Sequence, residues 1–382
     1  MPTATTRPTD PVPAPTLHLA LDLGNTTWQC AFASGLAHAP RLRTVPARDL
    51  AALAAEIAAA KRRGGLAADA PVVSCYEAGR DGFWPHRALL AQGIANTVVD
   101  AASIEVNRRQ RQAKSDRLDA GALVRLLIRH TAGERGVWHV VHVPSVAAED
   151  QRHLHRELFA LTRQRTRQVT RIKSLLALHG VVLPRPRGLP ARLPALVGWD
   201  GAPLPVGVAA RLTREWTRLR ALVHDIRTLE RERAEWLAAP DAPTDPVRRM
   251  VARLRALRGI GDVSAWLYTT EFFAWRQFHN RREVAALAGL APTTRASGDV
   301  SHELGISKAG NVFIRALAIE LAWSWVRRQP TSALTRWYRV RFAGGGPRQR
   351  RIGIVAVARK LLIALWRYLE TDQLPEGALL KS

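Results

Sequence analysis

The sequence predicts an α/β domain with a mixed sheet at the N-terminus, then a helical coiled segment, then a mostly α-helical C-terminal domain. Between residues 17 and 146, short apolar runs alternate with helical segments, which is typical of layered α/β folds. From residue 147 onward the apolar residues recur with a helical period, which indicates packed helices. With 382 residues, 47% of them hydrophobic, the chain is long enough for two or three domains with cores of their own.

The N-terminal domain is expected at residues 17–146, after a disordered tail at 1–16. The tail is rich in Pro and Thr and lacks the apolar run of a signal peptide. Within the domain, apolar runs and amphipathic stretches are separated by turn residues. The predicted strands are 17–23, 27–34, 41–46, 71–75 and 96–99, and the predicted helices are 48–63, 82–92 and 117–130.

Two long helices are expected in the coiled segment at 147–238, on either side of a Pro-rich insert at 184–205. The second helix carries an apolar stripe, which fits either an antiparallel hairpin within the chain or a seam between two chains. A linker then leads to the C-terminal domain at 247–370. The stripe consists of Leu212, Trp216, Leu219, Leu222, Val223, Ile226 and Leu229.

Four acidic residues are the candidate catalytic centre of the N-terminal domain. Asp22 ends one apolar run and Glu77 follows another, and the ends of buried strands border the crevice where open α/β sheets bind ligands. Asp116 and Asp119 are three residues apart, so on a helix they share one face. Converging carboxylates repel one another unless a cation lies between them. One or two Mg²⁺ ions would fit, because Mg²⁺ takes carboxylate oxygens and keeps waters for a phosphate substrate.

The charge balance predicts a nucleic-acid partner. The formal net charge is +25, and of the 57 basic residues 6 are lysine and 51 are arginine. A GC-rich genome would explain the excess of arginine over lysine, but it would not explain the excess of bases over the 32 acids. Arginine binds phosphate through two parallel hydrogen bonds, and a basic surface of this size is typical of nucleic-acid binders. The candidate backbone contacts beside the acidic pair are Arg108, Arg109, Lys114 and Arg117.

Cysteine use and hydropathy indicate a cytoplasmic protein, which we expect to be associated with nucleoid DNA. Cys30 and Cys75 show neither metal-ligand spacing nor a disulfide framework, which suits a reducing cytosol. The longest apolar stretch, at 352–366, is interrupted by Arg359 and Lys360. We therefore expect no membrane-spanning helix.

The C-terminal domain contains a Gly-Ile-Gly turn between two helical segments. Gly259 and Gly261 would let the backbone approach a phosphate, and the next helix would offer its free N–H groups there. Arg258, directly before the turn, would add a phosphate contact. A plain turn uses the same residues, so the pattern gains its meaning from the basic character of the chain.

A polar segment at 289–311 is the second chemical candidate. We expect a flexible, glycine-flanked loop, in which Ser297 or Ser301 could attack a phosphodiester if a base or metal activated it. Serines in turns without a chemical role are the alternative. The neighbouring bases are Arg295, His302 and Lys308.

Taken together, these motifs resemble the DEDD transposases of the "one-ten" insertion-sequence family, whose members are known as bridge-RNA-guided recombinases. The resemblance covers about residues 17–370. It rests on Asp22-Leu-Gly-Asn, Tyr76-Glu77-Ala-Gly, Lys114-Ser-Asp-Arg-Leu-Asp119-Ala, Gly259-Ile-Gly, Ala288-Gly-Leu-Ala-Pro, Ser297-Gly and Gly305-Ile-Ser-Lys-Ala-Gly-Asn311.

The resemblance implies a RuvC-like (RNase H-type) N-terminal domain and a C-terminal transposase domain. It implies that Asp22, Glu77, Asp116 and Asp119 bind Mg²⁺ and that Ser297 is the nucleophile. It also implies an element-encoded bridge RNA that pairs with donor and target DNA, and a dimer of dimers whose sites are shared between subunits. The chain departs from the family pattern in several places: Ser115 replaces a threonine, Arg258 replaces a proline, and the N-terminal tail and the insert at 184–205 are longer than expected.

Three alternative functions remain at the level of sequence. A Mg²⁺-dependent nuclease or junction resolvase would need the four acids but not Ser297. An actin-like ATPase or sugar kinase would use the Asp22-Leu-Gly-Asn-Thr-Thr segment as a phosphate loop, but the sequence offers neither a second glycine-rich loop nor an adenosine pocket. A non-enzymatic nucleic-acid binder would leave the electrostatic cost of four convergent acids unexplained.

Overall fold

The computed structural model describes residues 15–104, 116–239, 245–297 and 300–381, and at 102, 116–119, 294–297 and 300–303 it describes the backbone alone. The predicted tail therefore lies outside the described residues except for its last two positions. The chain divides into two compact units, with the division between Val143 and Pro144.

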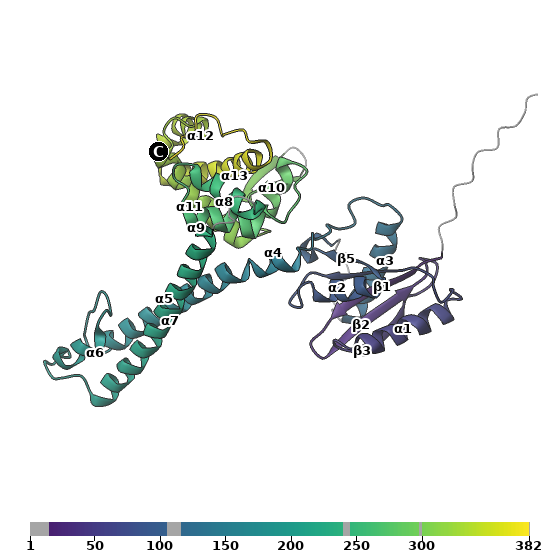
Figure 1. The fold of residues 1–382 in the computed structure, drawn as a ribbon, viewed down its shortest axis with the longest axis horizontal. Helices are drawn as coiled ribbons and strands as arrows, with labels where there is room; N and C mark the ends of the chain where they lie inside the picture. The colour runs from purple at the N-terminus through teal and green to yellow at the C-terminus, as the bar shows by residue number, and fades with distance from the viewer. Residues whose placement is uncertain (1–14, 105–115, 240–244, 298–299, 382) are drawn as a thin grey trace, which may run out of the picture. The chain divides into compact units, whose positions relative to one another are not determined.

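The first unit is built on a mixed five-stranded sheet (Figure 1). The strand order is β3-β2-β1-β4-β5. The first three strands form an antiparallel meander, and β4 and β5 are added parallel to β1. The strands are β1 (Leu17–Leu23), β2 (Thr27–Ala33), β3 (Arg41–Pro46), β4 (Val72–Glu77) and β5 (Ala95–Val99).

Helices cover both faces of this sheet because alternate side chains of each strand point to opposite faces. On one face, Leu19 and Leu21 pack in a cluster that includes Leu53 and Leu89 from the covering helices. On the other face, the small side chain of Ala20 lies in a cluster with residues of α3. The helices are α1 (Leu50–Arg63), α2 (Trp84–Ala91) and α3 (Asp116–Thr131), with a short 3₁₀ turn, η1 (Ala101–Ser103).

The strands and helices predicted for this unit are confirmed, with ends that differ by at most two residues. The agreement has a physical reason. The inner strands are nearly continuous apolar runs, as expected for strands buried on both faces, and their turns contain glycine or charged residues. Asp49 caps α1 by accepting a hydrogen bond from the N–H of Ala52 at 2.8 Å.

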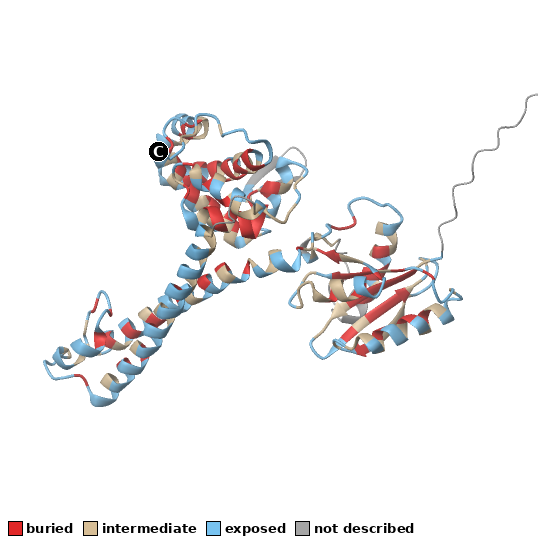
Figure 2. Cartoon of the chain, in the orientation of Figure 1, coloured by how far each residue is buried: buried red, intermediate tan, exposed pale blue. Residues whose placement is uncertain are grey.

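The second unit begins with an antiparallel pair of long helices, α5 and α7 (Figure 1). The apolar stripe of α7 packs inside this hairpin: Leu212 and Leu219 lie in one cluster with Ile172 and Leu176 of α5. Figure 2 shows buried residues along the facing sides of the two helices. The structure thus favours an antiparallel hairpin within the chain, and not a seam between two chains, as the explanation of the apolar stripe. The elements here are α4 (Val146–Asp150), α5 (His153–Ala177), α6 (Leu189–Arg192), η3 (Leu193–Ala195) and α7 (Val206–Ala238).

A helical bundle follows, centred on α13, whose residues Val357, Leu361 and Leu365 are at most 1% exposed. Among the described residues, no helix is long and apolar enough to cross a membrane. The bundle consists of α8 (Pro246–Ala256), α9 (Asp262–Tyr268), the π-helical turn η4 (Thr269–Phe273), α10 (Arg281–Leu287), α11 (Val312–Arg328), α12 (Ala333–Tyr338), the π-helical turn η5 (Arg339–Ala343) and α13 (Pro347–Thr371).

The predicted loop at 289–311 is corrected by the structure, which forms an antiparallel hairpin from β6 (Pro292–Ser297) and β7 (Val300–Ile306). The hairpin forms although its sequence is polar. β-Branched residues such as Thr293, Thr294 and Val300 favour extended backbone. The many turn-forming residues of the same segment predict a loop instead, which is why the hairpin was not expected. Ser297 pairs with Val300, at the end of the hairpin away from its base.

Candidate functional site

Asp22 and Glu77 meet at the carboxyl ends of two neighbouring parallel strands. In the register of β1 and β4, Leu21 lies beside Tyr76, so the residue after each of these comes at the same sheet edge. Both acids line one cavity of about 280 Å³. The cavity thus lies outside the strand ends, and it is lined by the two acids that were expected there, Asp22 and Glu77.

Helix α3 contributes the opposite wall of this cavity through Leu123. Leu123 comes four residues after Asp119 and seven after Asp116, which is the spacing of one helix face. Small residues of the sheet, Ala20 and Cys75, are packed with α3 in the same cluster. The backbone thus places the helix that carries the acidic pair against the cavity, while the side chains of residues 116–119 lie outside the described part of the structure.

A third acid of this cavity was missed by the sequence analysis. Asp81 lines it, and its side chain, 7% exposed, lies 3.4 Å from Arg48 and 3.6 Å from Arg80. The hydroxyl of Tyr76 donates to the carbonyl of Gly82 at 2.9 Å, which fastens the loop after β4. The available signal was the charged pair Arg80-Asp81 between two glycines, shortly after Glu77, a pattern that predicts a turn near the end of the strand. The two arginines place positive charge beside the acids, where a phosphate substrate would need it.

The donors present suit a hard cation such as Mg²⁺, which prefers carboxylate oxygens. Asp22 and Glu77 would supply two of them. Among residues whose side chains the structure describes, no group of three or more His, Cys, Asp or Glu is placed to hold a metal ion. Asp116 and Asp119 of α3, predicted to complete the ligand set, have side chains outside the described part of the structure.

Thiolate ligands are disfavoured in this unit. Burial raises the pKa of Cys30 to about 12, with a further contribution from Glu56. The pKa of Cys75 is raised as well, by burial first and by the neighbouring Glu77 second. Both thiols stay protonated at neutral pH, and a protonated thiol is a poor metal ligand.

The hairpin with the candidate serines is fastened to the helical bundle through Asn311. The side-chain oxygen of Asn311 caps α11 by accepting from the N–H groups of Phe313 at 2.9 Å and Ile314 at 3.1 Å. Its amide nitrogen donates to the carboxylate of Glu271 at 2.9 Å. Asn311 closes the segment that follows β7, so the end of the hairpin segment is tied to a buried acid.

Glu271 is the centre of a buried polar cluster that joins three elements. It belongs to the π-helical turn η4 and is 1% exposed. From α5, His155 approaches its carboxylate to 2.9 Å and Arg156 to 2.7 Å. The guanidinium of Arg276 donates to its backbone carbonyl at 2.7 Å. The base of the helix pair, the turn and the segment after the hairpin therefore share one carboxylate.

The charges in this cluster shift two pKa values. Burial by itself would raise the pKa of Glu271, but the hydrogen bonds and charges of His155 and Arg156 outweigh it and lower the pKa to about 2. Burial lowers the pKa of Arg276 to about 9, against the attraction of Glu271. Sequence reasoning missed this cluster, because Glu271 lies between two threonines and two phenylalanines in the chain and its partners on α5, His155 and Arg156, are more than a hundred residues away.

The Gly-Ile-Gly turn connects α8 and α9, so the predicted helix–turn–helix is confirmed. Gly259 has φ +93°, and a Cβ there would lie 3.3 Å from the Cβ of Arg328, so glycine is required. Asp262, in the first turn of α9, pairs with Arg255 at 2.7 Å. This acid occupies part of the end at which a phosphate was expected, so phosphate binding at Gly259 and Gly261 stays a prediction.

The other predicted nucleic-acid contacts are distributed as follows. Arg258 and Lys308 are exposed on the second unit. The side chains of Arg117 and Arg295 lie outside the described part of the structure, as do Arg108, Arg109 and Lys114 altogether. The four acids belong to the first unit and Ser297 belongs to the second.

Comparison with known proteins identifies the family. The sequence model described as "Transposase IS116/IS110/IS902 family" matches residues 251–336. A protein of Sinorhizobium fredii named "Putative transposase y4rJ" is 41% identical over 376 residues, which cover 96% of this chain and 95% of the relative. The transposase for insertion sequence element IS1111A of Coxiella burnetii is 25% identical over 292 residues, 75% of each chain. This chain therefore belongs to the IS116/IS110/IS902 family of transposases.

Proposed function

We propose that this transposase is a site-specific DNA recombinase of an insertion sequence. It cuts and rejoins DNA through a phosphoserine intermediate, and an element-encoded bridge RNA guides it to donor and target. The observation that carries the proposal is the cavity at the strand ends, lined by Asp22 and Glu77 and walled by α3. That arrangement fits a RuvC-like domain in which Asp116 and Asp119 complete the acidic set.

The acidic set would hold Mg²⁺, which when bound polarises the scissile phosphate and favours attack on it. Arg48 and Arg80, paired with Asp81 at the cavity, would offset the negative charge of the DNA strand. The carboxylates alone would repel that strand, so the arginines are as much a part of the site as the acids.

Ser297 is the proposed nucleophile. Its Oγ attacks the phosphorus, a new P–O bond to serine forms, and the P–O bond to the leaving strand breaks. The proton lost by the serine hydroxyl is gained overall by the leaving oxygen, which becomes a free hydroxyl. One phosphodiester replaces another, so the reaction can be reversed on a new strand without ATP. In the hairpin register Ser297 pairs with Val300, whereas Ser301 pairs with Ala296. The two serines therefore occupy different, neighbouring pairs, and one is not expected to replace the other.

The proposed partners are donor DNA, target DNA and the bridge RNA, and the working form is a homo-oligomer, a dimer of dimers. The charge of +25 supports polyanionic partners.

The proposal is tested by trapping the covalent intermediate. The purified protein is mixed with Mg²⁺, labelled donor and target DNA, and RNA transcribed from the flank of its own element, and the products are separated on a denaturing gel. A labelled protein–DNA band is expected for the wild type and for Ser301→Ala, and its loss is expected for Ser297→Ala, for Asp119→Ala and without RNA. An adduct that survives Ser297→Ala would overturn the assignment of the nucleophile.

A second candidate is a Mg²⁺-dependent nuclease or junction resolvase without a covalent intermediate. The observation in its favour is that the described residues that line the acidic cavity all belong to the first unit. This enzyme would release cleaved DNA without an adduct, and Ser297→Ala would leave its cleavage rate unchanged.

A further inference from the structure

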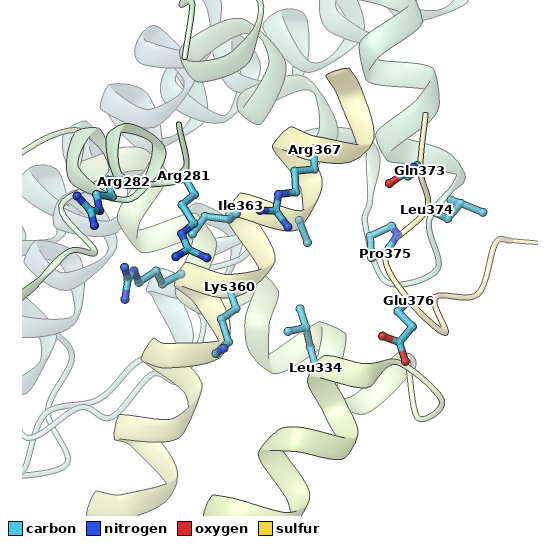
Figure 3. A pocket seen from close by; sticks show the side chains of 12 residues that line it. Arg281, Arg282, Leu334, Lys360, Ile363, Arg367, Gln373, Leu374, Pro375 and Glu376 are labelled. Atoms are coloured by element: carbon cyan, nitrogen blue, oxygen red, sulfur yellow. The ribbon is translucent and has the colours of Figure 1, made fainter. Parts of the chain in front are cut away.

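We propose that a basic cavity beside α13 binds the sugar–phosphate backbone of a nucleic acid, at a place separate from the acidic cavity and the serine hairpin. The cavity measures about 580 Å³ and lies between α10, α12, α13 and the chain that follows α13 (Figure 3). This inference rests on the proposed function in one respect, that the protein handles DNA and RNA.

The lining of the cavity is strongly cationic. Five basic side chains contribute to it, against one carboxylate, that of Glu376. Glu376 lies 3.2 Å from Arg336, which is outside the lining. Figure 3 shows cationic side chains of α10 and α13 coming together around the opening. The five cations are Arg281, Arg282, Arg359, Lys360 and Arg367.

The described residues leave the positive charge of these side chains largely uncompensated, although Lys360 makes a cation–π contact 4.7 Å from the ring centre of Trp337. Within the described residues, none of the five has a carboxylate partner within 4.0 Å. The Nε of Arg359 is buried without a hydrogen-bond partner. Unpaired like charges around one cavity repel one another, and a buried unpaired donor costs free energy. The repulsion is relieved when an anion with several acceptor oxygens occupies the cavity, whereas the buried Nε of Arg359 is out of reach of a ligand.

Helix stability does not account for the positions of these residues. Arg281 and Arg282 occupy the first turn of α10, where the helix dipole favours acids and disfavours cations. On α13, Lys360 and Arg367 are seven residues apart and share a face, while the opposite face is buried in the bundle core. One helix thus has an apolar side that holds the bundle together and a cationic side that faces the cavity.

The shape and chemistry of the cavity favour a nucleic-acid backbone as its occupant. Leu334, Ile363 and Leu374 supply apolar surface between the cations, which suits a sugar lying between two phosphates. DNA and RNA carry the same phosphodiester groups, and the experiment distinguishes them.

The test compares binding of the full-length protein to labelled duplex DNA and to RNA from the element's flank, by fluorescence anisotropy at several salt concentrations. EDTA is present throughout, so binding is measured without strand cleavage and independently of Ser297. The test variant is Lys360→Gln/Arg367→Gln. The matched control is Arg249→Gln/Arg327→Gln, which removes the same charge from two exposed arginines of the same unit that do not line the cavity.

For the test variant, the slope of log K against log salt should fall by about 1.8 with duplex DNA or about 1.4 with single-stranded RNA, if each cation contacts one phosphate. Near 0.1 M salt this corresponds to binding about 20- to 60-fold weaker. The nucleic acid whose slope falls is the occupant, and a fall in both arms means that the two share the cavity. The charge-keeping variant Lys360→Arg/Arg367→Lys should retain the wild-type slope.

A test variant that binds both nucleic acids with the slope of the control variant would overturn the proposal. So would an equal loss in the test and charge-keeping variants, because that result would indicate damage to the fold. Neither result bears on the covalent adduct at Ser297, so failure of this inference and failure of the proposed function are separately visible.

Discussion

Replacing Glu271 by glutamine keeps the shape of the side chain but removes a negative charge from the centre of the second unit. The carboxylate is 1% exposed and is contacted by His155, Arg156 and Asn311 at 2.9, 2.7 and 2.9 Å. The variant leaves the buried guanidinium of Arg276 without its acidic neighbour. We therefore expect Glu271→Gln to destabilise the junction between the helix pair and the bundle.

The expected loss follows from the shift in pKa. The pKa of Glu271 falls from 4.5 to about 2 on folding, and at about 1.4 kcal/mol per pKa unit this corresponds to about 3 kcal/mol of stability at neutral pH. Breaking a buried ion pair from one side costs about 3–5 kcal/mol, which agrees. A loss of about 3 kcal/mol is a large part of the stability of an ordinary domain.

Urea denaturation of the full-length protein, followed by tryptophan fluorescence, measures this loss. Trp266 and Trp275 report on the region, because Trp266 packs on His155 and Trp275 on Arg152. The matched control is Glu376→Gln. Its side chain is 79% exposed and pairs with Arg336 at the surface, so its loss should cost about 0–1 kcal/mol.

The pH dependence gives a second readout. A carboxylate whose pKa is depressed by folding stabilises the protein above its unfolded pKa, and this contribution is lost as the pH falls through the folded pKa. The difference in stability between wild type and Glu271→Gln should therefore be constant near neutral pH and shrink between pH 4.5 and about 2. A difference under 1 kcal/mol at pH 7, or one that does not shrink in acid, would refute the reasoning.

Two further predictions concern the fold of each unit. Gly259→Ala should lower the free energy of unfolding by about 1–2 kcal/mol, because φ +93° strains alanine and its Cβ would press on Arg328; a denaturation midpoint equal to the wild type would contradict the positive φ. Cys30 and Cys75, buried and with raised pKa values, should resist iodoacetamide at pH 8 in the native protein and react after unfolding in urea. The alkylation of each thiol is followed by mass spectrometry. Equal rates in the native and the urea-unfolded protein would show that the thiols in the sheet core are accessible to solvent.

The sheet of the first unit was predictable because local and global signals agree there. The runs that end at Asp22 and Glu77 are apolar enough to be read as buried strands, and parallel pairing brings strand ends together. Asp81 could not be predicted in this way, because it lies on a loop and not at the end of a strand. Its place depends on the hydrogen bond between Tyr76 and Gly82, and this contact has no periodic signal in the sequence.

The second unit shows where sequence reasoning stops. The hairpin strands at 292–297 and 300–306 are rich in polar and turn-forming residues and show no regular apolar alternation, so hydrophobic periodicity could not reveal them. The Glu271 cluster joins residues 115 positions apart, a separation at which composition and spacing carry no information. Arg359 and Lys360 were visible only as interruptions of an apolar stretch, and their role in a cationic cavity depends on the neighbouring α10.

The most direct test of the central claim is to locate the DNA on the protein. After reaction with Mg²⁺, RNA and DNA, the adduct would be digested with nuclease and protease, and the modified peptide sequenced by mass spectrometry. The account predicts a nucleotide attached through phosphate to Ser297 in the wild type, and none in Asp22→Asn or Glu77→Gln. Cleaved DNA with an unmodified Ser297, or a nucleotide on Ser301, would contradict it.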